Sequence, residues 1–208
     1  MRKFLTLALI VFTGMLYTCS TAGSTAQSAS TSTQSEWISL FDGSTLDGWS
    51  PSENKSSVKV RDGAILLDGP RSHLFYSGAV ENANFKNFEF KADIKTVPGA
   101  NSGIYIHTEY QEEGWPSKGY EVQIHNTNIN PEGYVERKLT GSLYAVRNIF
   151  KQMVPDEEWF TMHIIVMGNQ IITKLNDQVI VDYVEPENPV RRDNSQGRVL
   201  SSGTFAIQ

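Results

Sequence analysis

The sequence contains very little cysteine, no excess of positive charge and no apolar run long enough to cross a bilayer comfortably. With Cys19 as its single cysteine, the chain cannot form an internal disulfide. The 18 basic and 23 acidic residues give a net charge of −5 without a basic cluster, which argues against nucleic acid as a partner. The one nearly continuous apolar stretch, Phe4 to Leu16, is shorter than the roughly 20 residues of a membrane-spanning helix.

The N-terminal residues carry the pattern of a secretory signal peptide. Positive charge at Arg2 and Lys3 precedes the apolar stretch, which is the usual order in such peptides. The segment that ends at Cys19 resembles a bacterial lipobox, although Tyr17 and Thr18 are larger than the residues usual there. We therefore predict a signal peptide over residues 1–19, lipidation at Cys19 and export to the cell envelope or periplasm. Plain signal cleavage without a lipid anchor is the alternative.

The next segment, residues 20–35, contains only Ser, Thr, Ala, Gly and Gln. Such a segment cannot bury enough apolar surface to offset the entropy lost on ordering, so we predict a disordered tether. Residues 36–208 then form a single domain of a length that can bury a substantial core.

Within this domain, short apolar runs alternate with Gly, Asn, Asp and Pro, and no helix of ordinary length is predicted. This pattern is typical of an all-β sandwich or barrel. Asp62-Gly63 and Asn176-Asp177 predict tight hairpins between their flanking runs. The expected strands include residues 58–60, 64–67, 73–76, 88–94, 159–167, 171–175 and 179–183.

Two further segments are expected to be strands. In residues 141–146, Leu143 and Ala145 would face the core and Tyr144 the opposite side. Residues 204–208 alternate, with Phe205 and Ile207 inward, and no turn or polar tail follows. We predict from this that the chain is C-terminally truncated and lacks a last strand, which would leave an unpaired apolar-backed edge.

The most informative stretch is a pair of segments, residues 104–109 and 120–125, joined by a polar loop. Side chains alternate along a strand, so each segment should turn one apolar face to the core. If the two strands pair, the other face gathers two imidazoles, three acidic or amide groups and a phenol. These residues are Tyr105, His107, Glu109, Glu121, Gln123 and His125. An ordinary solvated sheet face is the alternative, but this composition favours a polar binding surface.

Four motifs in order resemble a known family. LFDGSTLDGW at 40–49, ANSGIYIH at 100–107, GYEVQIHN at 119–126 and TGSLYAV at 140–146 are similar to the 3-keto-disaccharide hydrolase family, also known as 3-keto-glucoside 1,2-lyases and 3-keto-2-hydroxy-glucal hydratases. The resemblance implies a concanavalin A-like jelly roll of two antiparallel sheets with a sugar-binding concave face. Many members have Arg at the position of His107 and Asp at that of Asn126, so we expect a subgroup with different substrate or metal use.

The resemblance also implies a reaction, namely cleavage of 3-keto-glycosides by C2 proton abstraction, β-elimination and hydration. This chemistry needs a base near C2, an acid near the glycosidic oxygen and an electrophile at the C3 oxygen. We expect Glu121 or His125 as the base and His107 as the acid.

Other residues are candidates for substrate binding. Lys118 or Tyr144 would donate to the C3 oxyanion, Gln123 would hold sugar hydroxyls and Trp115 would stack on a sugar face. Tyr105 and Glu109 belong to the same polar face, although ordinary solvated charge is the simpler interpretation for Lys118 and Glu109.

The sequence also allows other interpretations of the histidines and of the function. His107, His125 and Glu121 could ligate a divalent metal, but no HExxH or other compact ligand motif supports one. His73 and His163 are expected to be structural. A non-catalytic carbohydrate-binding module on the cell envelope is the second functional hypothesis, and an adhesion or scaffold domain with a merely wet face is the third.

Overall fold

The computed structural model describes residues 37–129 and 135–208, and the predictions for the signal peptide, Cys19 and the tether lie outside these residues. The described elements are strands and three short 3-10 helices, with no helix long and apolar enough to span a membrane. They are β1 (Trp49–Pro51), η1 (Lys55–Ser57), β2 (Val58–Arg61), β3 (Ala64–Leu67), β4 (Leu74–Tyr76), η2 (Val80–Ala83), β5 (Phe88–Ile94), β6 (Ser102–Thr108), β7 (Tyr120–Ile124), β8 (Phe160–Met167), β9 (Gln170–Leu175), β10 (Gln178–Val184), η3 (Asp193–Ser195) and β11 (Thr204–Ile207).

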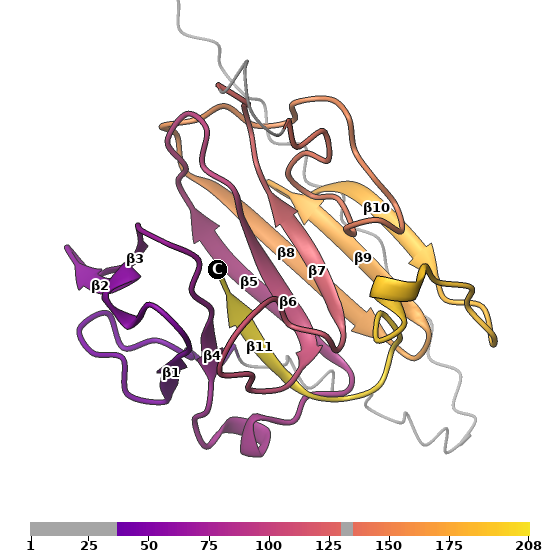
Figure 1. The fold of residues 1–208 in the computed structure, drawn as a ribbon, viewed down its shortest axis with the longest axis horizontal. Helices are drawn as coiled ribbons and strands as arrows, with labels where there is room; N and C mark the ends of the chain where they lie inside the picture. The colour runs from indigo at the N-terminus through magenta and orange to yellow at the C-terminus, as the bar shows by residue number, and fades with distance from the viewer. Residues whose placement is uncertain (1–36, 130–134) are drawn as a thin grey trace, which may run out of the picture. The chain divides into compact units, whose positions relative to one another are not determined.

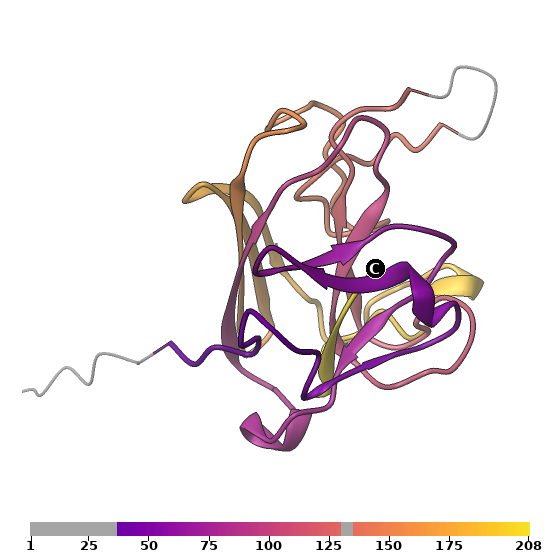
Figure 2. The ribbon, with the colours of Figure 1, turned by 90° about the vertical axis from the view of Figure 1, so that its left-hand side faces the viewer.

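The strands form two main antiparallel sheets. One has five strands in the order β1-β4-β11-β6-β7, and the other has four in the order β10-β9-β8-β5 (Figure 1). Figure 2 shows β8, β9 and β10 in one layer and β6 and β7 in the other. The β2–β3 hairpin forms a separate two-stranded sheet. The predicted all-β class is therefore confirmed, as a jelly-roll sandwich of two antiparallel sheets.

The hydrophobic core lies between the two main sheets. The five-stranded sheet contributes Ile104, Ile106, Tyr120 and Val122, and the four-stranded sheet contributes Met162, Ile164, Val166 and Ile171, all of which are buried. Phe205 of β11 packs against Phe88 and Phe90 of β5, with ring centroids 4.8 and 4.7 Å apart. Burial of this apolar surface is the main source of stability and fixes which face of each strand points outward.

Most of the predicted strands are present, since the two hairpins form and β5 spans residues 88–94 as expected.

The segment at residues 141–146 does not form the predicted strand. It follows the edge of β7 through a single bridge between Leu143 and Val122 and then turns. Leu143 is buried as predicted, but Ala145 is exposed with φ 61° and Val146 packs against the core instead. A tight turn here breaks the alternation on which the prediction depended.

Residues 204–207 form β11, which pairs with β4 on one side and β6 on the other. β11 is thus an inner strand of its sheet. Its position matters for the site because it joins β4 to β6, and so determines which aromatic side chains of β4 border the polar residues of β6 and β7. The absence of a further strand after it stays a prediction.

Candidate functional site

The β6–β7 pair has one apolar and one polar face. The register pairs Ile104 with Val122 in the core and Tyr105 with Glu121 on the opposite side. We call this second side the outer face and define it by His73, Phe75, Tyr105, Glu121 and Gln123. Phe75, Tyr105 and Ala206 form a small apolar cluster there, separate from the core between the sheets. The predicted grouping of Tyr105, Glu121 and Gln123 on one face is confirmed.

His107 does not belong to the outer face, so the prediction that it lies beside Glu121 is wrong. A β-bulge sets Ile106 and His107 against the single residue Phe205 of β11, and His107 has φ 54°. The extra residue in the bulge reverses the alternation and turns the imidazole toward the other sheet. Its ring lies 5.7 Å from that of Phe88 in β5.

The contacts of His107 are those of a neutral structural side chain. Its Nε2 donates to the Lys86 carbonyl at 2.9 Å, and the Ser201 amide donates to its Nδ1 at 3.2 Å. Burial lowers the pKa of His107, because a charged imidazole would lose its solvation there. A proton donor to a sugar on the outer face must therefore be another group.

Glu121 is the central carboxyl group of the outer face. Its side chain is accommodated by Gly103, where an added Cβ would lie 2.8 Å from the Glu121 Oε1. Glu121 is only 8% exposed, and burial raises its pKa to about 7, even though Arg198 and a hydrogen bond from Tyr105 act in the opposite direction. A carboxyl with such a pKa can both take and return a proton near neutrality.

Three charged residues beside Glu121 were missed by sequence reasoning, namely Glu136, Lys138 and Arg198. They gather around Tyr144, whose hydroxyl donates to Glu136 Oε2 at 2.9 Å. Lys138 Nζ donates to Glu136 Oε1, also at 2.9 Å.

Arg198 connects this group to Glu121. Its guanidinium lies 4.9 Å from the Tyr144 ring and donates to the Tyr144 carbonyl, and its Nη2 is 3.8 Å from Glu121 Oε2. No motif marks these three residues, because loops distant in sequence bring them together.

His125 and Gln123 each present an acceptor with no partner among the described residues. The Nδ1 of His125 donates to the Ala100 carbonyl at 2.7 Å, so in the neutral ring Nε2 is a bare acceptor. Gln123 donates to Asn101 Oδ1 at 2.7 Å, while its own Oε1 is unpaired. Both orphaned atoms are buried. Since buried polar groups normally have partners, they are suited to accept hydrogen bonds from ligand hydroxyls.

Aromatic rings continue the outer face on the side of Tyr105 away from Glu121. The His73 ring lies 5.2 Å from Tyr105 and 5.6 Å from Trp115, and Trp115 is 53% exposed. Burial lowers the pKa of His73 to about 4, so this ring packs as a neutral group. Trp115 thus has the exposure and the backing that a sugar-stacking platform needs.

Four other residues named in the sequence analysis take structural or peripheral places. Lys118 and Glu109 pair with each other at 3.3 Å on an exposed loop, as expected of solvated charges. His163 contacts Glu89 at 2.8 Å across the β5–β8 pair. Asn126, at a position where the resemblance expects Asp, is buried and donates to Thr96 and to the Pro155 carbonyl, so it anchors a loop.

The residues suggested for a metal do not fit a shared ion. Over residues 37–129 and 135–208, no three His, Cys, Asp or Glu side chains are grouped closely enough to hold one. His107 faces away from Glu121, toward the other sheet. The three do not form a ligand set.

The model of the 3-keto-alpha-glucoside-1,2-lyase-like domain matches residues 36–208. The chain belongs to this family. A 3-keto-disaccharide hydrolase of Bacteroides thetaiotaomicron is 24% identical over 168 residues, which cover 71% of this chain and 58% of that protein. The chain therefore spans less than two thirds of the length of that relative.

Solved structures show the same fold as this 3-keto-alpha-glucoside-1,2-lyase-like chain. A candidate glycosyl hydrolase from Parabacteroides distasonis superposes with a TM-score of 0.65 at 22% identity, covering 81% of this chain and 85% of its own. A second from the same organism gives 0.56 at 18% identity, covering 77% and 90%. The carbohydrate-binding module CBM66 of Bacillus subtilis gives 0.50 at 12% identity, covering 77% and 86%. At these identities the likeness concerns the fold alone.

Proposed function

We propose that this chain is a carbohydrate-active enzyme that cleaves 3-keto-glycosides, with Glu121 as the base. The observation that carries the proposal is a buried carboxyl with a pKa of about 7, placed between a phenol and a guanidinium on the outer face. Membership of the family and the name of the Bacteroides relative support the substrate class.

The proposed reaction uses the acidity of the hydrogen at C2, next to the C3 ketone. Glu121 takes that proton, and the electron pair of the broken C–H bond forms an enolate with its charge on the C3 oxygen. The enolate then forms a C1=C2 double bond and the C1–O bond breaks. The leaving oxygen takes up a proton, which Glu121 returns. Water then adds across the double bond, with hydroxyl at C1 and hydrogen at C2.

Neighbouring residues have roles that match their contacts. Arg198, close to Glu121, supplies fixed positive charge for the C3 oxyanion. Tyr105 donates a hydrogen bond to Glu121. Burial raises the pKa of Tyr105, so it stays a neutral donor. The bare acceptors of His125 and Gln123 would hold sugar hydroxyls, and Trp115 would stack on an adjoining ring.

The test follows hydrogen exchange at C2, which ordinary glycoside hydrolysis does not cause. 3-Keto-trehalose is incubated with the protein in D₂O, and deuterium at C2 and released sugar are measured by NMR and chromatography. Glu121→Gln should lower both by roughly 10²- to 10⁴-fold while the circular dichroism spectrum is unchanged. Glu158→Gln, the same change at an exposed loop position, should leave both intact. Undiminished exchange in Glu121→Gln would refute the assignment.

A non-catalytic carbohydrate-binding module is the second candidate, and a specific observation favours it. Two aromatic residues over the outer face, Trp115 and Tyr110, are 53% and 48% exposed, and Tyr110 packs on Phe75 at 5.2 Å. Exposed rings backed by a rigid sheet are the usual means of binding a sugar face. Binding of 3-keto-trehalose without C2 exchange or sugar release would favour the module over the enzyme.

A further inference from the structure

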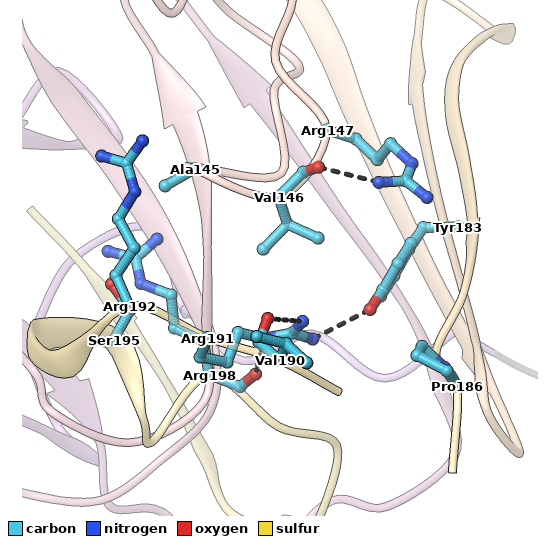
Figure 3. Close-up of a pocket in the computed structure, with 10 residues that line it drawn as sticks. All are labelled: Ala145, Val146, Arg147, Tyr183, Pro186, Val190, Arg191, Arg192, Ser195 and Arg198. Carbon is cyan, nitrogen blue, oxygen red and sulfur yellow. Dashed lines mark hydrogen bonds between the residues drawn. The ribbon is translucent and has the colours of Figure 1, made fainter. Parts of the chain in front are cut away.

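A cavity of about 370 Å³ lies next to the candidate site. Of the residues that the structure describes, four arginines line it, Arg147, Arg191, Arg192 and Arg198, and no acidic side chain does. Figure 3 shows Arg147, Tyr183 and Pro186 on one side and Arg192 and Ser195 on the other. The chain as a whole carries a net charge of −5, so this local concentration of positive charge is unlike the rest of the molecule. Two of the four, Arg191 and Arg198, lie beside Glu185 and Glu121, so the uncompensated positive charge of the cavity belongs to Arg147 and Arg192.

The four guanidinium groups differ in how far the protein uses their donors. Arg191 is fully engaged, donating to the hydroxyls of Tyr120 and Tyr183 at 2.7 and 2.8 Å and contacting Glu185 at 3.1 Å. It therefore forms a fixed part of the cavity wall. Arg198 is shared with the candidate site through its contact with Glu121.

Arg147 and Arg192 have donors to spare. Arg147 is exposed and lies 5.0 Å from the Tyr183 ring, and among the residues that the structure describes it donates only to the neighbouring Val146 carbonyl at 3.0 Å. Arg192 is exposed, and within the described part of the chain its guanidinium has no hydrogen bond or ion pair. A guanidinium carries five N–H donors in a fixed fork that fits the two oxygens of a carboxylate or sulfate.

We propose that this cavity is an oxyanion-binding subsite, which takes a carboxylate or sulfate carried by a sugar. Its volume is within the range of small-ligand sites and suits a single sugar unit. Arg198 belongs both to the cavity wall and to the surroundings of Glu121, so one ligand can occupy both places. That the anion belongs to the leaving group of a 3-keto-glycoside rests on the proposed function, whereas the binding of an oxyanion does not.

The test is a binding measurement that needs no turnover. The Nε–Hε signals of the arginines are followed by ¹H–¹⁵N NMR during titration with glucuronate, glucose 6-sulfate, inorganic sulfate or glucose. The two acidic sugars should bind at least about 10-fold more tightly than glucose, because charge-assisted hydrogen bonds contribute on that scale. Added KCl should weaken the binding of the acidic sugars, because salt screens the attraction between charges. The affected signals should be those of Arg147 and Arg192. Equal affinity for glucuronate and glucose would overturn the proposal.

Variants distinguish binding in the cavity from a nonspecific attraction of anions to any surface arginine. The double variant Arg147→Gln/Arg192→Gln should lose at least about 10-fold in affinity for the acidic sugars. Arg61→Gln removes an exposed arginine from the β2–β3 hairpin, outside the cavity, and should leave the affinity unchanged. An equal loss in Arg61→Gln would overturn the subsite. If inorganic sulfate binds as tightly as the acidic sugars, the oxyanion subsite stands and the sugar contributes nothing to its recognition.

The binding experiment and the exchange experiment test the two proposals separately. Anion binding without C2 exchange would refute the proposed function and leave the subsite intact. C2 exchange that depends on Glu121, with no preference for acidic ligands, would refute the subsite and leave the proposed function intact.

Discussion

Two buried glutamates, Glu121 and Glu185, are each accompanied by an arginine and a tyrosine, yet their surroundings differ. Glu185 accepts from the Tyr120 hydroxyl, from Arg191 at 3.1 Å and from the Leu200 amide at 2.9 Å. Glu121 has its arginine only at 3.8 Å. The two side chains are almost equally buried, at 8% and 9% exposed.

The two glutamates differ in how completely their carboxylate oxygens are paired, not in how deeply they are buried. A buried carboxylate whose oxygens are paired ties segments of the chain together. One that is buried with incomplete pairing keeps a raised pKa and the capacity to exchange a proton. We therefore interpret Glu185 as structural and Glu121 as the reactive group, and the predictions below test this division.

The largest expected effect is on stability at the Glu185 cluster. Arg191→Met would leave a buried carboxylate without its cation, so the free energy of unfolding should fall by about 3–5 kcal/mol in urea denaturation. Arg198→Met is the matched change beside Glu121 and should cost only about 1 kcal/mol, because its ion pair is longer and less complete. Equal losses in the two variants would remove the distinction.

The second prediction concerns pH. Burial raises the pKa of Glu121 from 4.5 to about 7, so the folded protein holds this proton more tightly than the unfolded chain does. The stability due to that proton is fully present below about pH 4.5 and is lost as the pH rises through about 7, roughly 3 kcal/mol in total. Turnover should rise over the upper part of the same range, because the base must be ionised.

The measurement compares the wild type with Glu121→Gln by urea denaturation between about pH 4 and pH 8, the interval that brackets both pKa values. The two proteins should be most alike in stability at the acidic end, and the variant should gain relative to the wild type as the pH rises. A constant difference across this range would show that Glu121 titrates normally.

The third prediction extends the comparison to a buried imidazole. His107→Gln should lower the free energy of unfolding by about 1–2 kcal/mol, because the hydrogen bonds to Lys86 and from Ser201 are disturbed. Its kcat and KM should stay near those of the wild type, since His107 faces the other sheet. A large fall in kcat with unchanged stability would restore His107 as the acid.

The fold was largely predictable from the sequence. Alternation located β5 and the β9–β10 hairpin because these strands have one buried and one open face, and Asp-Gly and Asn-Asp marked the turns. Alternation also placed Tyr105 opposite Glu121 correctly, since both lie where the β6–β7 ladder is regular.

The rest of the site was not predictable for two physical reasons. The bulge at His107 is produced by pairing with β11, almost 100 residues later, so nothing local to β6 announces the change of face. Arg198, Glu136 and Lys138 reach Tyr144 and Glu121 from loops, where no periodicity links sequence to direction.

The smallest expected effect is at Trp115, and it shows whether the outer face binds sugar beyond Glu121. If its ring stacks on a substrate, Trp115→Ala should raise KM about 5- to 10-fold with kcat nearly unchanged, as the loss of one aromatic contact of about 1 kcal/mol predicts. Trp159 is a matched control, because it is 60% exposed and lies beside Lys95 at the start of β8 instead of over His73. Trp159→Ala should leave KM unchanged in the same steady-state assay with 3-keto-trehalose. If both variants raise KM equally, the effect comes from a general loss of surface aromatics, and the sugar site is confined to Glu121 and the side chains that touch it.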